Sequence, residues 1–243
     1  MPRFFIGADQ ITENTATVLG DDARHIARSL RLAVGDTVTL CSEGYDLSAR
    51  LTKIRDEECE AEIISREKSL CEPPSEITLF MAYPKGDKLE LVVQKAVELG
   101  ASRIVPFESS RCIKRPPQEK SEKITARLSK IAAEAAKQCG RGIIPTVLGP
   151  ISFTALCGRI KSEGKVLFCY EKPGCASIKE VLDNTPTADR LAVVIGSEGG
   201  FSEEEADRLV SEGAVAVTLG KRILRCETAP IFALSAICYR YEL

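Results

Sequence analysis

The 243-residue chain has little of what a metal site requires. It contains one histidine, and none of its 10 cysteines stands at C-x-x-C spacing from another. Zinc sites and redox motifs depend on that spacing. We therefore expect no bound metal, and we interpret the cysteines as small, mostly buried apolar residues.

Long apolar segments and an excess of positive charge are also missing. No apolar run approaches the roughly 18 residues of a membrane span, and Met1–Asp9 does not have the pattern of a secretory signal. The net charge is only −2, so any affinity for nucleic acid must come from local patches. With 44% hydrophobic and 28% charged residues, the composition is that of a folded protein, which we expect to be cytoplasmic.

The first 72 residues have the alternating pattern of short strands. We expect strands at 36–40, 47–51 and 59–64, a further strand at 3–6 and a helix at 21–32. Together they predict a small β-rich unit, in the manner of a barrel. Pro73 and Pro74 then interrupt any regular element, so we place a domain boundary there and expect domains at 1–72 and 73–243.

From Ile77 onward, apolar strands alternate with amphipathic helices. Strands are expected at 77–82, 103–106, 166–170, 191–195 and 214–219, with helices between them, including 87–99 and 118–141. This order predicts an α/β fold with a mostly parallel sheet covered on both faces. Ligands of such sheets bind at the carboxyl ends of the strands.

A glycine-rich turn, Gly196–Ser202, follows one of these strands. Its spacing fits neither the dinucleotide nor the nucleotide triphosphate motif. Ser202 and Glu205 have capping-box spacing, and Glu203–Glu205 place three carboxylates where a helix would otherwise attract phosphate. The turn therefore indicates either a ligand without phosphates or a plain connection from strand to helix.

The last helix is apolar on nearly every side. Pro230 suits its first turn, and residues 231–239 contain almost no polar face. Such a helix must be covered on more than one side. We expect it to pack on the sheet and on a second subunit, which makes the protein a homodimer through its C-terminal helix.

Two segments near the carboxyl end carry a specific resemblance. Ile195–Ser202, followed by Leu219–Ala229, resembles the paired signature of the RsmE family of the SPOUT superfamily, enzymes that methylate N3 of a uridine in 16S ribosomal RNA. Further agreement is found in Arg3–Phe5, His25–Arg31 and Lys85–Gly100. The chain departs from the family at Ser197, where proline is usual, so this turn is expected to be less rigid.

The resemblance implies a PUA-like β-barrel before a SPOUT domain whose parallel sheet contains a trefoil knot. It further implies S-adenosylmethionine as cofactor, a homodimer, and 16S ribosomal RNA or the small ribosomal subunit as partner. The cofactor contacts implied in three loops are Tyr170, Ile195, Gly196, Ser197, Glu198, Gly199, Gly200, Leu219, Gly220, Ile223, Leu224, Arg225, Thr228 and Ala229. This cofactor carries no phosphate, which agrees with the acidic start of the helix after the turn.

Methylation of uracil N3 requires that its proton be accepted, or that a cation stabilise the anion. Glu198 and Glu227 are candidate bases, and Arg111, Arg222 or Arg225 could supply the charge. Each arginine could equally bind an RNA phosphate or form a structural ion pair. The sequence leaves the choice open.

Basic residues in both domains are candidates for RNA contact. They are Arg3, His25, Arg28, Arg31, Lys85, Lys88, Arg111, Lys114 and Arg141. The basic arc of the helix at 118–141 is also what an ordinary solvated face looks like. Two other functions stay open: a SPOUT methyltransferase acting on a ribose or a transfer RNA, and a non-catalytic RNA-binding assembly factor.

Overall fold

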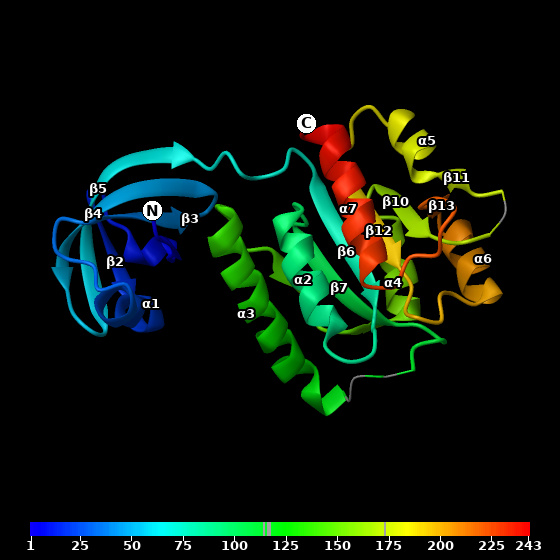
Figure 1. Ribbon diagram of the computed structural model, residues 1–243, viewed down its shortest axis with the longest axis horizontal. Coiled ribbons are helices and arrows are strands. Elements are labelled where there is room, and N and C mark those ends of the chain that lie inside the picture. Colours follow the sequence, from blue (N-terminus) through cyan, green and yellow to red (C-terminus); the bar gives the residue numbers. More distant parts are fainter. Residues whose placement is uncertain (114, 116–117, 173) are drawn as a thin grey trace. The chain divides into compact units, whose positions relative to one another are not determined.

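The computed structural model describes residues 1–113, 115, 118–172 and 174–243 (Figure 1). Its chain divides into two compact units, one of residues 1–72 with 136–144 and one of residues 73–135 with 145–243. The chain leaves the first unit beside the adjacent prolines Pro73 and Pro74. The return of residues 136–144 to that unit was not expected from the sequence.

The first unit is a five-stranded sheet with short helices. Its elements are β1 (Arg3–Phe5), a 3-10 turn (Ala8–Gln10), β2 (Thr15–Leu19), α1 (Gly20–Arg24), a π-helical turn (His25–Ser29), β3 (Thr37–Ser42), β4 (Tyr45–Ile54) and β5 (Glu58–Lys68). The strand order is β1-β3-β4-β5-β2, with β1 parallel to β3 and the other neighbours antiparallel. Glu43 and Gly44, with φ of 51° and 80°, form the two-residue turn between β3 and β4. Positive φ at both positions suits a tight hairpin.

The prediction of a helix at 21–32 is wrong at the carboxyl end of the helix. The helical backbone runs from Gly20 to Arg24 and continues as one π-helical turn to Ser29. Arg31 has a φ of 52°, which is left-handed and cannot continue the helix. Ile26 is fully buried and belongs to the apolar core of the unit, which also contains Phe4 and Leu40.

The second unit contains a sheet of eight strands whose pairings are all parallel. Its strands are β6 (Glu76–Ala82), β7 (Arg103–Glu108), β8 (Thr146–Val147), β9 (Ile151–Ser152), β10 (Lys165–Cys169), β11 (Ala176–Ser177), β12 (Arg190–Ile195) and β13 (Val215–Thr218). Its helices are α2 (Lys88–Glu98), α3 (Ser121–Cys139), α4 (Phe153–Ile160), α5 (Ile178–Asp183), α6 (Glu203–Ser211) and α7 (Thr228–Tyr241), and a 3-10 turn (Gln118–Lys120) precedes α3. The predicted α/β class with a parallel sheet is confirmed.

The order of the strands decides where a ligand site can form. The sheet runs β11-β13-β10-β12-β6-β7-β8, with β9 beside β7. Because β13, β10, β12 and β6 are parallel neighbours, the loops that leave their carboxyl ends emerge together. In Figure 1, α2 and α7 lie in front of these central strands, and α7 packs on β12 and contacts α2 and α5. Of the helices in the described part of the chain, none is both long and apolar enough to cross a membrane.

A buried carboxylate ties the opposite ends of these strands together. Glu163, 5% exposed, accepts hydrogen bonds from the hydroxyl of Thr78 on β6 at 2.8 Å and from Arg103 Nη2 on β7 at 3.0 Å. Buried polar groups are costly when they lose their partners.

We therefore predict that Glu163→Ala destabilises the protein by about 2 kcal/mol, because it leaves the Thr78 hydroxyl, in a residue only 1% exposed, without its acceptor. Urea unfolding measures the change. Lys161→Gln is the control: Lys161 pairs with Glu212 through a side chain that is 76% exposed, so its loss should change stability by less than about 0.5 kcal/mol. Equal effects of the two substitutions would contradict the role of Glu163.

Candidate functional site

A cavity of about 780 Å³ lies in the second unit at the carboxyl ends of β10, β12 and β13. All the cofactor residues implied by the sequence line it except Thr228: Tyr170, Ile195, Gly196, Ser197, Glu198, Gly199, Gly200, Leu219, Gly220, Ile223, Leu224, Arg225 and Ala229. They come from three loops that are distant in sequence. The parallel sheet brings these loops to one place.

The glycine-rich turn is packed too closely for side chains. A Cβ on Gly199 would lie 2.9 Å from Arg111 Cβ and 3.0 Å from the Arg111 carbonyl oxygen, and one on Gly196 would lie 3.1 Å from Gly200 Cα. Gly200 has a φ of +64°, which a residue with a side chain rarely adopts. Ser197 Oγ donates to the Arg111 carbonyl at 3.3 Å, and Arg111 Nη1 donates to the Gly199 carbonyl at 3.2 Å. The turn is therefore held against the segment that follows β7.

The helix after the turn begins as the sequence predicts. Ser202 Oγ accepts from the Glu205 amide at 3.2 Å, and Glu205 Oε2 accepts from the Ser202 amide at 3.1 Å, which completes the capping box. The other oxygen of Glu205 accepts from the Ser110 amide at 2.7 Å. The Phe201 ring stacks on Phe107 and meets Phe168 edge-on, so the turn is anchored in the core.

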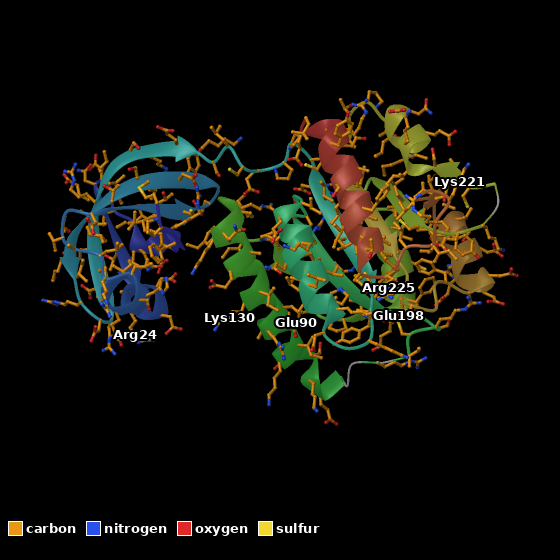
Figure 2. The ribbon with its side chains drawn as sticks, viewed as in Figure 1. Arg24, Glu90, Lys130, Glu198, Lys221 and Arg225 are labelled. Atoms are coloured by element: carbon orange, nitrogen blue, oxygen red, sulfur yellow. The ribbon has the colours of Figure 1, made fainter. Side chains whose placement is uncertain are left out.

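Lys88, the first residue of α2, joins two of the loops around the cavity. Its Nζ lies 3.0 Å from Glu198 Oε1 in the glycine-rich turn and 3.2 Å from Glu227 Oε2 before α7. The backbone amide of Lys85 also donates to Glu198 Oε1, at 3.2 Å. Glu198 and Lys88 line the cavity, whereas Glu227 is not among the lining residues. Figure 2 shows Glu198 and Arg225 near the first turn of α7.

These contacts keep all three groups charged near neutral pH. Burial acts to raise the pKa of Glu198, but hydrogen bonds from its own amide, Lys88 and the Lys85 amide outweigh it and lower the pKa. Burial likewise acts on Glu227, whose pKa is lowered overall by its own amide, the Cys226 thiol and Lys88. The hydrogen bonds with Glu198 and Glu227 raise the pKa of Lys88. Burial raises the pKa of Cys226 to about 12, so this residue is a neutral thiol.

The candidate catalytic residues are distributed around the cavity. Glu198, Arg111 and Arg222 line it, and Glu227 contacts two lining residues, Lys88 and Cys226. The side chain of Arg222 is exposed, and Arg225 lies beside α7, where its carbonyl accepts from the amides of Thr228 and Ala229 at 2.8 and 2.9 Å. The arrangement supplies carboxylates and guanidinium groups at one opening. Lys172 was not expected from the sequence to belong to the site, and its pairing with Glu203 at 3.0 Å joins two loops at the cavity.

The structure gives two of the expected RNA contacts a structural role. Arg141, expected to contact RNA, is 4% exposed and pairs with Glu72 at 2.7 Å, so its side chain is buried within the first unit. Arg3 pairs with Asp46 at 2.7 Å through a side chain that is 17% exposed. Both arginines join segments of the first unit that are far apart in sequence, which the sequence alone could not reveal.

The other expected RNA contacts are exposed to different degrees. His25, Arg31, Lys85 and Arg111 are exposed, and Arg28 pairs with Asp56 on the surface of the first unit. Lys88 is occupied by two carboxylates. Lys114 lies outside the described residues. Across the described ranges, no group of three histidine, cysteine or acidic side chains is placed to hold a metal ion.

We predict that Gly199→Ala lowers the free energy of unfolding by about 1–3 kcal/mol, because the new methyl group meets the Arg111 backbone. Gly158→Ala is the control, since Gly158 lies within α4 with no atom within 4 Å of an added Cβ. That substitution should raise stability by about 0.5–1 kcal/mol. Urea unfolding of both variants tests the close packing, and a Gly199→Ala protein as stable as the parent would refute it.

Comparison with known proteins agrees with this geometry. A family model described as an RNA methyltransferase domain matches residues 71–238, and one described as an RNA methyltransferase PUA domain matches residues 18–67. The chain is 35% identical to ribosomal RNA small subunit methyltransferase E of Bacillus subtilis over 100% of this chain and 98% of that protein. It is 30% identical to the protein of that name in Synechocystis, over 97% of this chain and 76% of that protein.

A solved structure has the same architecture. The ribosomal RNA small subunit methyltransferase E of Neisseria gonorrhoeae, crystallised bound to S-adenosylmethionine, matches with a TM-score of 0.88 and 33% identity. The match covers 98% of this chain and 97% of that one. The predicted resemblance to the RsmE family is confirmed, and the chain belongs to the RNA methyltransferase family named ribosomal RNA small subunit methyltransferase E.

Proposed function

We propose that this protein transfers the methyl group of S-adenosylmethionine to N3 of a uridine in 16S ribosomal RNA of the small subunit. The observation that carries the proposal is the cavity, which is formed by the two signature loops and the Tyr170 loop. The Neisseria gonorrhoeae relative, with the same architecture, was solved bound to this cofactor.

The cavity fits a methyl donor without phosphates. Apolar side chains such as Ile195 and Val217 line it, and two of its carboxylates, on Glu198 and Glu203, are already paired with Lys88 and Lys172. Three carboxylates occupy the first turn of α6, and a pyrophosphate placed there would be repelled. The sulfonium of S-adenosylmethionine supplies an activated methyl group, and the loops hold it in line with the nucleophile.

The residues around the cavity divide the chemical work. As the N3 electron pair forms a bond to the methyl carbon, the bond from that carbon to sulfur breaks and its electrons pass to sulfur. The N3 proton must leave as well, and Glu198 is our proposed acceptor because it lines the cavity and carries negative charge. We assign Arg111 and Arg222 to stabilise the charge that develops on the uracil, since both line the cavity.

RNA binding is proposed for exposed basic groups in both units. Lys85 and Arg111 lie beside the cavity, and His25, Arg28 and Arg31 lie on the first unit, within the residues that the PUA model matches. Contacts of this kind position RNA through its phosphates. We propose that the protein acts in the cytoplasm, where ribosomal RNA is modified, and that the chain of the second unit contains the trefoil knot that the resemblance implies.

The proposal predicts methyl transfer to small ribosomal subunits or their RNA, with the product mapped as 3-methyluridine. Calorimetry should also detect binding of S-adenosylmethionine to the protein alone. Absence of binding heat would indicate a non-catalytic RNA-binding factor, and a methyl group on a ribose or a transfer RNA would indicate another SPOUT target. Either outcome rejects the proposed reaction.

We further propose that α7 mediates a homodimer. Phe232 and Tyr239 are 44% and 75% exposed, and their spacing with Ser235 and Ala236 puts them on one face of the helix. The opposite face, with Ala233, Leu234 and Ile237, is buried against the sheet. An apolar face of this kind is typical of a subunit interface.

Sedimentation at micromolar concentration should therefore show a dimer, and Phe232→Asp should shift it toward monomer because the charge would be buried at the interface. Val210→Asp on α6 is the control, since Val210 is 54% exposed outside α7. A monomeric parent protein would contradict the proposal.

A further inference from the structure

One ammonium group holds two acidic loops of the cavity. Lys88 Nζ lies within 3.2 Å of carboxylate oxygens of both Glu198 and Glu227, and it lies 3.7 Å from Cys226 Sγ. Lys88 follows β6, Glu198 follows β12, and Glu227 follows β13. A single side chain on α2 therefore links the glycine-rich turn to the loop that begins α7.

The ammonium of Lys88 neutralises the negative charges of the two carboxylates. The side chains of Lys88, Glu198 and Glu227 are 34%, 25% and 18% exposed, so water screens them only in part. Without Lys88, two negative charges that share one small volume would repel each other. The two carboxylates would then move apart, and Glu198 would lose its fixed orientation in the cavity.

The contacts also distinguish the two oxygens of Glu198. Oε1 accepts both the Lys88 ammonium and the Lys85 amide. Oε2 receives neither of them, and it is therefore the oxygen that we assign to the N3 proton. Fixing one oxygen from behind orients the other toward its substrate.

We propose that Lys88 is a positioning residue for methyl transfer, which holds Glu198 Oε1 and Glu227 so that the cavity loops stay together and Glu198 Oε2 faces the target base. The inference rests on the proposed function. It also replaces our expectation that Lys88 contacts RNA. A lysine held by two carboxylates has no free charge to offer a phosphate, whereas Lys85 beside it is exposed.

The positioning role of Lys88 predicts a specific change in the pH dependence of methyl transfer. Lys88 lowers the pKa of both carboxylates, so Glu198 stays ionised as the pH falls. Loss of Lys88 should raise the pKa of Glu198, and activity that needs its ionised form should then be lost at a higher pH than in the parent. The charged and titratable groups that face this site are Glu198, Glu227 and Cys226 at Lys88, with Arg111, Cys169, Tyr170, Glu171, Lys172, Glu203, Arg222 and Arg225 around the cavity.

The test compares Lys88→Met and Lys88→Arg with a matched control, Lys95→Met. Lys95 is on the same helix, and it pairs with Glu98 at 2.8 Å through side chains that are 35% and 27% exposed, but it does not line the cavity. Methyl transfer to small ribosomal subunits is measured at saturating S-adenosylmethionine over a range of pH. Thermal unfolding of each variant reports any general loss of stability.

We expect Lys88→Met to lower kcat by tenfold or more, on the order of one lost charge-assisted hydrogen bond, with little change in KM for RNA. Its acid limb should move to higher pH, Lys88→Arg should restore most of kcat, and Lys95→Met should behave as the parent. Adding Glu227→Gln to Lys88→Met should recover part of the lost kcat, because it removes one of the two repelling charges.

Other results would overturn the inference. A rise in KM for RNA with unchanged kcat would show that Lys88 contacts the substrate instead. An unshifted acid limb, or a second substitution that only adds to the loss, would show that the ion pairs do not position Glu198. If Lys88→Met does not fold, Lys88→Gln takes its place, because it removes the charge but keeps a polar side chain. It should show the same loss of kcat and the same shift of the acid limb, and parent-like values of both would contradict our account. Failure of the parent to methylate would reject the proposed function itself.

Discussion

The site depends on how closely two backbones approach each other. The glycine-rich turn lies against the backbone and Cβ of Arg111, in space that a side chain on residue 199 would need. Phe201 anchors the turn from below, and the capping box starts α6 directly after it. The main chain of the turn is therefore fixed and exposed to the cavity, and it can approach a ligand without side chains in between.

A fixed turn alone would not enclose a ligand. The loop before α7 must stay beside it, and both segments carry a carboxylate, on Glu198 and Glu227. The two carboxylates would repel each other, but the ammonium of Lys88 on α2 forms ion pairs with both and neutralises this repulsion. Ion pairs therefore hold the loop before α7 beside the turn, while close packing holds the turn itself in place. The three carboxylates in the first turn of α6 also distinguish this site from the phosphate-binding turns that similar α/β sheets often carry.

Local patterns in the sequence predicted much of this arrangement. Alternating strands and helices gave the parallel sheet, the spacing of Ser202 and Glu205 gave the start of α6, and the apolar segment 231–239 gave the helix α7. Each of these features depends on residues close together in the chain. The resemblance to the RsmE family added the identities of the loop residues, which spacing alone could not supply.

Contacts between distant residues could not be predicted in the same way. Lys88 is 110 residues from Glu198, and Arg141 is 69 from Glu72. Nothing local distinguishes such a lysine or arginine from one that binds RNA. The π-helical turn at His25–Ser29 and the two-residue strands β8, β9 and β11 are likewise set by packing and not by their own sequence.

We propose that the turn at 196–200 and the loop at 219–229 enclose a methyl donor. The most direct measurement is a crystal structure of the protein with S-adenosylmethionine. We predict the donor between these two segments, with its methyl group toward the opening at Glu198 and Arg222. A donor bound elsewhere, or a nucleotide phosphate at the start of α6, would contradict the account.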